Sequence, residues 1–177
     1  YIDNLNRALK PYESLHSWTL TELICYNSRL PNKIRVVVGR NAGGVYNHRF
    51  YFDELSPVNN EYPIGLFACA IYKKYGDFET FAEAWKTNAK DVFGSGYVWL
   101  VVNANRCLEM IRTKNQETPI GKKVSPILCL DLWEHAYYLK HYNNRDSYID
   151  DWLEVIDWHR AEELYARATN KSNKNCA

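Results

Sequence analysis

A turn-rich stretch divides this chain into two parts that must fold differently. Between residues 53 and 63 it holds a Ser-Pro pair at 56–57, two asparagines at 59–60 and a further proline at 63. These residue types favour turns and interrupt both helices and strands. We therefore predict a domain boundary there. An N-terminal helical hairpin domain should cover 1–55, a C-terminal α/β domain 64–169 and a polar tail 170–177.

The N-terminal part is predicted to begin inside a helix. Its apolar stripe has helical spacing and consists of Ile2, Leu5, Leu9 and Tyr12. This helix should end near Pro11, because proline interrupts a helix. Thr19 followed by Glu22 has the spacing of a capping box, which predicts the start of a second helix.

Residues 33–52 carry mixed signals. The three consecutive valines at 36–38 favour a strand, whereas the later apolar positions suit a helix. We predict a helix from Asn41 onward. Gly43 and Gly44 would each weaken that helix by about 1 kcal/mol relative to alanine, so close packing or a functional site is needed to explain them.

The C-terminal part mixes helical segments with short β-prone runs. In chain order, the predicted elements are helices at 64–75 and 77–88, strands at 97–103, 108–113 and 127–130, and helices at 144–156 and 158–168. The connection at 104–107 suits a hairpin, so the first two strands should be antiparallel. The predicted fold class is α+β: an N-terminal helical hairpin, then a helical domain around a small three-stranded antiparallel sheet.

The composition indicates no general binding surface, so the function must depend on a local site. The formal net charge of +1 over 177 residues gives no general attraction for nucleic acid, and no run approaches the roughly 18 apolar residues of a membrane span, so we expect neither partner. The five cysteines are widely spaced and contain no C-x-x-C pair, which favours a cytoplasmic or other reducing compartment. We expect Cys69 and Cys129, which lie in apolar runs, to be buried, and Cys176 to be exposed.

A carboxylate and two imidazoles lie among aromatic residues. Asp131 follows directly on the last predicted strand, His135 comes four positions later, and His48 stands between Tyr46 and Phe50. Such spacing is common, and taken alone it favours a surface or capped aspartate and a hydrogen-bonded core histidine over a metal site. Burying a carboxylate beside aromatics costs several kcal/mol unless a cation or strong donor compensates, however.

Two histidines and one aspartate suit iron or manganese with open positions. A mononuclear iron oxygenase would use the same donor set. The other histidines lie in polar surroundings and should be at the surface; they are His16, His141 and His159.

Three motifs resemble those of the iron/manganese superoxide dismutases, in order and spacing. Residues 43–48 (GGVYNH) resemble that family's second-ligand helix, 93–101 (FGSGYVWLV) its glycine-aromatic segment, and 131–138 (DLWEHAYY) its most specific motif. The resemblance covers nearly the whole chain. It implies an oxidoreductase, here an antioxidant enzyme that disproportionates superoxide to dioxygen and hydrogen peroxide at one manganese or iron ion per subunit.

The resemblance also implies roles for residues of the first and third motifs. By that resemblance His48, Asp131 and His135 are metal ligands. Glu134 would pair with the partner subunit's copy of the His135 ligand across a two-fold interface, and Tyr138 would reach across it. The expected assembly is a homodimer, with a tetramer as the alternative.

Two further residues match family positions near the metal. Tyr1 matches the tyrosine at the substrate entrance. Gln116 stands where manganese-type members carry a glutamine that hydrogen-bonds the solvent at the metal, while Gly44 stands where many iron-type members carry it instead. The resemblance therefore favours manganese over iron.

The sequence departs from the family pattern in three places. The family's first histidine ligand lies a few residues before the position of Tyr1, so we expect the sequence to be part of a longer natural chain. Tyr97 replaces a tryptophan beside the metal and brings a hydroxyl that needs a partner, and Phe52 replaces another frequent tryptophan. An alternative function is a truncated or catalytically impaired homologue that serves as a structural or interaction subunit.

Overall fold

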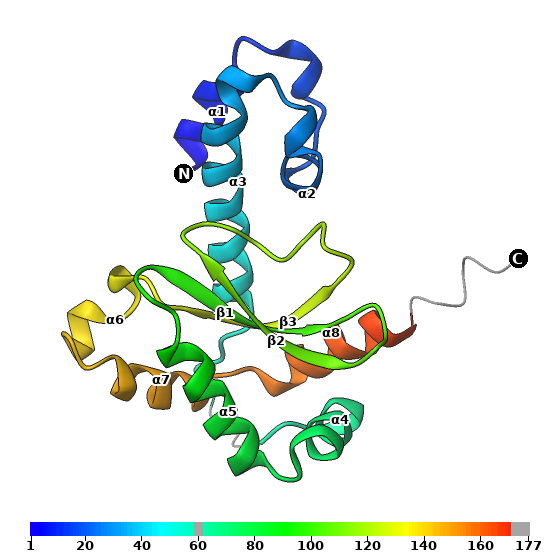
Figure 1. Cartoon of the computed structure of the whole chain (residues 1–177), viewed down its shortest axis with the longest axis vertical. Coiled ribbons are helices and arrows are strands. Elements are labelled where there is room, and N and C mark those ends of the chain that lie inside the picture. The colour runs from blue at the N-terminus through cyan, green and yellow to red at the C-terminus, as the bar shows by residue number, and fades with distance from the viewer. Residues whose placement is uncertain (59–61, 171–177) are drawn as a thin grey trace, which may run out of the picture.

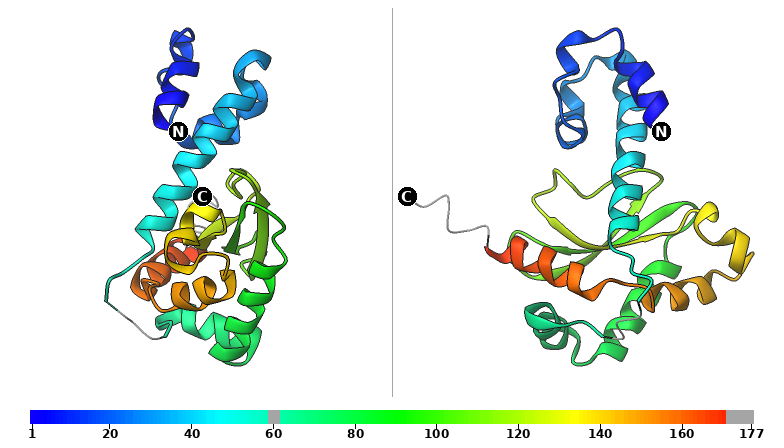
Figure 2. Two further views of the ribbon diagram at one scale, coloured as in Figure 1. Left: turned by 90° about the vertical axis from the view of Figure 1, so that its left-hand side faces the viewer. Right: turned by 180° about the vertical axis from the view of Figure 1, so that it is seen from behind.

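The fold was obtained as a computed structural model that describes residues 1–58 and 62–170. Helix α3 (Asn32–Asp53) forms a long rod, with α1 (Ile2–Leu9) and α2 (Leu20–Cys25) beside its outer end. The rest of the chain gathers at the other end of α3 around a three-stranded sheet (Figures 1 and 2). The predicted α+β class, with N-terminal helices and a three-stranded antiparallel sheet, is confirmed.

The first two helices begin and end where local chemistry predicts. Helix α1 ends one residue before its cap at Lys10, directly ahead of Pro11. At the start of α2 the Thr19 hydroxyl accepts a hydrogen bond from the Glu22 N–H at 3.2 Å, and the Glu22 carboxylate accepts one from the Thr19 N–H at 2.7 Å. The predicted capping box is therefore present.

Helix α3 begins earlier than predicted. It starts at Asn32, directly after Pro31, so the valines at 36–38 are helical and the predicted start at Asn41 is wrong. Valine costs a helix well under 1 kcal/mol, which packing readily offsets. Val38 is fully buried in a cluster with Leu5 and Leu9 of α1, and this burial decides the conformation.

The C-terminal part follows the predicted order. Its elements are α4 (Gly65–Tyr75), α5 (Phe78–Lys90), β1 (Gly96–Val102), β2 (Leu108–Lys114), β3 (Ser125–Asp131), α6 (Glu134–His141), α7 (Arg145–Leu153) and α8 (Trp158–Asn170). The strands are antiparallel in the order β2-β1-β3. The hairpin predicted between β1 and β2 is thus confirmed, whereas α6 had no counterpart among the predicted helices.

Both faces of the central strand β1 are covered. Val98 and Leu100 join the main core, which also includes residues of α4, α5, α7 and α8. Tyr97 and Trp99 face the other way, into a cluster with Tyr46 of α3. The register pairs Tyr97 with Asp131, the last residue of β3, so that end of the sheet carries Asp131 toward α3.

Two surface predictions were wrong. Cys69 is exposed, because α4 turns Phe67 and Ile71 into the core instead. The side chain of His141 is only 8% exposed and bonds Ser147 of α7 through its Nδ1 atom.

Other surface predictions are confirmed. Cys129 is buried, and His16 and His159 are exposed. Helix α8 includes Asn170, and the remainder of the predicted tail, with Cys176, lies outside the described residues. Within 1–58 and 62–170, no helix combines the length and apolar character needed to cross a membrane.

Candidate metal centre

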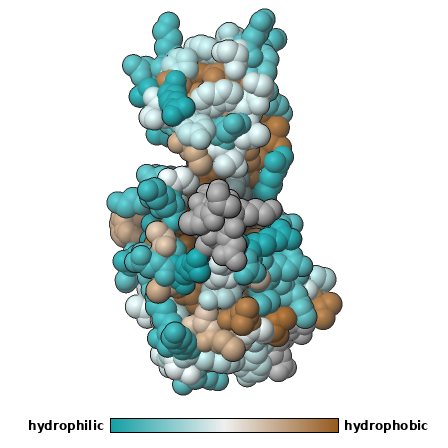
Figure 3. Space-filling model, turned by 90° about the vertical axis from the view of Figure 1, so that its right-hand side faces the viewer, coloured by the Kyte–Doolittle hydropathy of each residue, from teal (hydrophilic) through white to brown (hydrophobic). Residues whose placement is uncertain are grey.

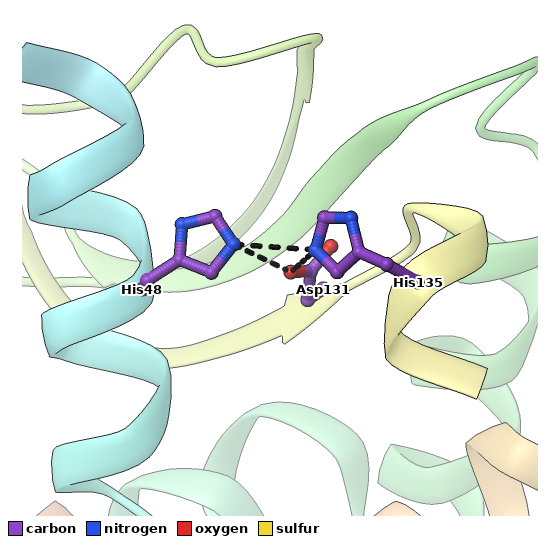
Figure 4. A group of neighbouring side chains, drawn as sticks. All are labelled: His48, Asp131 and His135. Atoms are coloured by element: carbon purple, nitrogen blue, oxygen red, sulfur yellow. Dashed lines mark hydrogen bonds and ion pairs between the residues drawn. The ribbon is translucent and has the colours of Figure 1, made fainter. Parts of the chain in front are cut away.

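Three predicted ligands come together from three elements. His48 projects from the C-terminal half of α3, Asp131 from the end of β3 and His135 from the first turn of α6 (Figure 4). The two histidine Nε2 atoms are 3.2 Å apart. The Asp131 Oδ2 atom lies 3.2 Å from the His135 Nε2 atom and 3.6 Å from the His48 Nε2 atom.

This triangle of donor atoms fits a single metal ion. Ligand atoms held at about 2.1 Å from one cation are separated by roughly 3.0 to 3.6 Å when they meet at right to trigonal angles. The three measured separations lie in that range. Two imidazoles and a carboxylate are a donor set that suits iron or manganese, so the residues present fit the predicted ion.

Hydrogen bonds orient two of these side chains. The His48 Nδ1 atom lies 2.6 Å from the Gly44 carbonyl oxygen, an acceptor, so Nδ1 carries the proton and Nε2 keeps its lone pair. The Asp131 Oδ1 atom accepts from the Trp133 N–H at 2.9 Å, which leaves Oδ2 directed at the histidines. Trp133 also stacks on His135, with ring centroids 5.7 Å apart.

Burial makes the Asp131 carboxylate costly without a positive neighbour. The residue is 1% exposed, and burial raises its pKa above the ordinary value. The hydrogen bond from the Trp133 N–H and the charges of His135 and His48 lower the pKa and offset part of this rise. A cation at this position would favour the ionised form directly.

A second network lies beside the three predicted ligands, with the Tyr1 and His48 ring centroids 5.4 Å apart. Gln116 is 5% exposed, and its Nε2 atom donates to the Tyr1 hydroxyl at 3.0 Å. Its Oε1 atom accepts from the Tyr97 hydroxyl at 3.0 Å and from the Asn47 Nδ2 atom at 3.1 Å. The Tyr97 hydroxyl, predicted to need a partner, finds it in Gln116.

The two glycines of α3 allow this network to approach the helix. A Cβ atom on Gly43 would lie 2.0 Å from the Gln116 carbonyl oxygen, and one on Gly44 would lie 2.7 Å from the Tyr1 ring. Real Cβ contacts are never so short, so both positions exclude a side chain. The expected close packing at these glycines is present.

Glu134 and Tyr138 lie on the outer surface of α6. Glu134 is exposed, Tyr138 is 51% exposed, and the His135 side chain between them is 50% exposed. Their predicted contacts with a partner subunit stay a prediction. The exposed His135 leaves room for such a contact.

Sequence reasoning missed a pair of tyrosines behind Asp131. The Tyr148 hydroxyl donates to the Asp131 backbone carbonyl at 2.8 Å and in turn accepts from the Tyr51 hydroxyl at 3.1 Å. Burial raises the pKa of Tyr51 to about 12 and also raises that of Tyr148, so both phenols stay protonated at neutral pH. The two tyrosines stand 97 positions apart, and no local pattern links them.

A buried carboxylate was missed as well. Glu54 is 1% exposed at the end of α3, and its two carboxylate oxygens lie 2.8 and 3.1 Å from the Cys129 nitrogen, whose N–H they accept. Burial raises the pKa of Glu54 well above its ordinary value, despite this hydrogen bond. A charged residue at a helix end is usually solvated, so the sequence held no signal for it.

Comparison with known proteins places the chain in a family. The model for the iron/manganese superoxide dismutases, C-terminal domain, matches residues 63–164. Superoxide dismutase [Mn] 3 of Leptolyngbya boryana is 36% identical over 175 residues, which are 99% of this chain and 73% of that protein. Superoxide dismutase [Mn] 2 of Bacillus anthracis is 38% identical over 168 residues, which are 95% of this chain and 80% of that protein. This chain belongs to the iron/manganese superoxide dismutase family.

Proposed function

We propose that this enzyme converts two superoxide ions and two protons to dioxygen and hydrogen peroxide, with a metal ion held by His48, Asp131 and His135. The main support for this proposal is that three potential ligand atoms from three elements lie within 3.6 Å of one another. The two relatives named as superoxide dismutases support this activity. They give no support to an impaired interaction subunit or to an iron oxygenase.

Manganese is the favoured ion, at one per subunit, with iron as the alternative. Gln116 brings its amide to the site, and the Tyr1 ring fills the space that a side chain at Gly44 would need. The network therefore supports the manganese-type position of the glutamine. Both compared relatives are named as manganese enzymes.

The protein's own residues would position the substrate and manage protons. A bound manganese or iron would supply the one-electron oxidation and reduction. The Gln116 amide and the Tyr1 hydroxyl form a hydrogen-bonded pair that can hold and pass a proton at the entrance. Asn47 and Tyr97 fix the Gln116 oxygen, so the amide keeps one orientation throughout the cycle.

The proposed assembly is a homodimer, which a tetramer could extend. Glu134 and Tyr138 would make its contacts on α6, next to the half-exposed His135. We also propose that 1–55 and 64–169 are two domains. In support, Leu5, Leu9 and Val38 belong to a cluster formed only by N-terminal residues, separate from the main C-terminal core.

Ligand and network variants test the proposal. His48→Ala and Asp131→Ala should each lower bound metal at least about tenfold, because each removes a donor atom of the ion. Gln116→Ala should keep its metal and lose turnover by roughly ten- to a hundredfold, because it acts through the proton network. Metal analysis and a superoxide-consumption assay measure both effects.

His159→Ala is the matched control, because it removes an exposed histidine far along the chain from these residues. It should keep both metal and activity. A His48→Ala protein with full metal content would contradict the ligand assignment. A Gln116→Ala protein with full turnover would contradict the role of the network but not the ligands.

A further inference from the structure

A cleft lies at the opposite end of the sheet from the proposed metal centre. Its volume is about 710 Å³, and its walls come from α4, α8 and the β1–β2 hairpin (Figure 1). Tyr97 pairs with Asp131 at one end of β1, while Val102 pairs with Leu108 at the other. Five residues of strand separate the two ends by about 17 Å, so this cleft is distinct from the metal centre.

Two thiols open into this cleft. Cys69 of α4 and Cys107 of the hairpin both line it, and both are exposed. Tyr165 of α8 lines the same cleft. Neither thiol has a role in the metal centre.

The charged side chains that line the cleft are cationic, and Glu162 of α8, outside the lining, accepts hydrogen bonds from the Leu66 and Phe67 N–H groups. Lys73, Lys74 and Arg106 line the cleft, and no acidic side chain from the described part of the chain lines it. Among residues 1–58 and 62–170, none of the three cations forms an ion pair. The remaining walls are largely apolar, and Figure 3 shows apolar residues in brown among teal ones on the lower half of this side of the molecule. Such a site attracts an anion that also has an apolar part.

Backbone bonds hold the hairpin side of the cleft in place. The Asn103 N–H donates to the Cys107 carbonyl at 2.9 Å, and the Asn103 side-chain oxygen accepts from the Asn105 and Cys107 N–H groups at 3.0 and 3.1 Å. Arg106 occupies the left-handed position of this loop, with a φ angle of 59°. Such a position completes a three-residue hairpin loop. Arg106 and Cys107 are therefore preorganised.

Helix α4 is tied to the same hairpin. The Lys74 ammonium group donates to the backbone carbonyl of Leu108. Lys73 and Cys69 lie one helical turn apart on α4 and line the cleft together. The cations and thiols on the two walls consequently belong to one site.

We propose that this cleft binds small anionic disulfides of the glutathione class and takes up half of the molecule as a mixed disulfide on Cys69 or Cys107. The protein sulfur loses its proton and attacks one sulfur of the bound disulfide. The disulfide's S–S bond breaks, a new S–S bond joins protein and ligand, and the released half leaves as a thiol that carries the proton. Lys73 and Arg106 hold the ligand's carboxylates during this exchange.

An anionic and a neutral disulfide test the site. The whole chain carrying Cys176→Ser, which removes the tail thiol, is treated with oxidised glutathione or with the neutral 2-hydroxyethyl disulfide, and peptide mass spectrometry follows each cysteine. For each cysteine, the rate ratio is the rate of modification by oxidised glutathione divided by the rate with the neutral disulfide. This ratio should be at least about tenfold higher at Cys69 or Cys107 than at Cys25, because cations concentrate the anionic probe. Cys25 is the matched control, an exposed thiol on α2 outside the cleft.

Charge removal separates binding in the cleft from ordinary thiol reactivity. Lys73→Gln combined with Arg106→Gln should lower the rate ratio several-fold at the cleft thiols and leave that at Cys25 unchanged. High salt should act in the same direction. Circular dichroism confirms that the variants keep the fold.

Two results would overturn the proposal. One is an equal rate ratio at the cleft thiols and Cys25, and the other is a preference that survives charge removal in the folded variant. The measurement does not involve superoxide turnover, so its failure would leave the proposed dismutase function untouched.

Discussion

The Tyr97 hydroxyl is one of two donors that hold the Gln116 amide oxygen. Asn47 supplies the other donor, so the oxygen has partners on two sides while the amide nitrogen bonds Tyr1. The aromatic ring of Tyr97 is fully buried against Trp99 and the end of β3. At this position the ring provides packing and the hydroxyl provides orientation.

Removing that hydroxyl should separate the two roles. We expect Tyr97→Phe to retain its metal, to lose about 1 kcal/mol of stability with the hydrogen bond, and to lose turnover several-fold because the amide gains freedom. Metal analysis, urea unfolding and superoxide consumption measure the three quantities. Tyr62→Phe is the control, since Tyr62 is 51% exposed and packs through its ring on Phe78. Unchanged turnover in Tyr97→Phe would show that Asn47 alone orients the amide.

Glu54 predicts a specific pH dependence of stability. Its folded pKa lies well above the ordinary value, chiefly because of burial. The folded state therefore keeps a proton that an unfolded glutamate releases near pH 4.3. Stability from this group is present below that pH and is lost as the pH rises toward the folded pKa, by up to about 1.4 kcal/mol for each pH unit.

Glu54→Gln should remove this loss and keep an acceptor for the Cys129 N–H. Urea unfolding between pH 5 and pH 8 should show a stability advantage of the variant that grows with pH. Glu154→Gln, at an exposed position after α7, should follow the wild-type curve. Parallel curves for Glu54→Gln and wild type would show that Glu54 is ionised in the folded state throughout this range.

At the scale of elements, α3 joins the N-terminal apolar cluster, the cluster around Trp99 of the sheet and the proposed metal centre. Its outer half packs on α1 through Val38, and its inner half packs on the sheet through Tyr46. Between them, Gly43 and Gly44 let the segment after β2 and the N-terminal residue touch the helix. The helix therefore sets the distance between His48 and the Gln116 network.

Two alanine substitutions on α3 should differ sharply. Gly43→Ala would drive a Cβ atom into the Gln116 carbonyl, which is backbone and cannot swing away, so we expect a loss of about 1 to 3 kcal/mol or more and reduced turnover. Gly39→Ala meets only the Asn27 side chain at 3.1 Å and gains up to about 1 kcal/mol of helix propensity. It should be near neutral. Urea unfolding and turnover assays compare the two, and equal effects would contradict the close approach at Gly43.

At the scale of the whole molecule, α6 and the residue that follows it expose an apolar surface beside the proposed metal ligands. Tyr138, Leu139 and Tyr142 are 51, 94 and 70% exposed. Exposed apolar groups of this size are typical of interaction surfaces. The proposed two-fold dimer would cover this surface and enclose His135.

Glu134→Ala should weaken that dimer. Removing one partner of a buried charged pair costs about 2 to 5 kcal/mol, so we expect the dissociation constant to rise at least tenfold. Sedimentation velocity over a series of protein concentrations measures it. The control Glu154→Ala removes an exposed glutamate outside this surface and should dissociate like the wild type. A dimer of unchanged stability in Glu134→Ala would place the interface elsewhere.

Sequence alone determined the features that depend on near neighbours. The Thr19 and Glu22 capping box and the hairpin after β1 each involve residues a few positions apart, whose geometry follows from residue type. The motif containing Asp131 and His135 was likewise readable, since the short connection from β3 to α6 lets two side chains four positions apart face one point.

Only the tertiary structure decided the features that join distant segments. Valine's weak strand preference at Val38 gave way to burial against α1, and Cys69 turned outward because other residues of α4 pack better in the core. The approach of His48 to His135, 87 positions away, depends on how α3 meets the sheet. The same packing brings Tyr148 to the Asp131 carbonyl and Gly43 to Gln116. Local propensities amount to less than about 1 kcal/mol per residue, whereas burial of one large side chain contributes more, so packing decides wherever the two conflict.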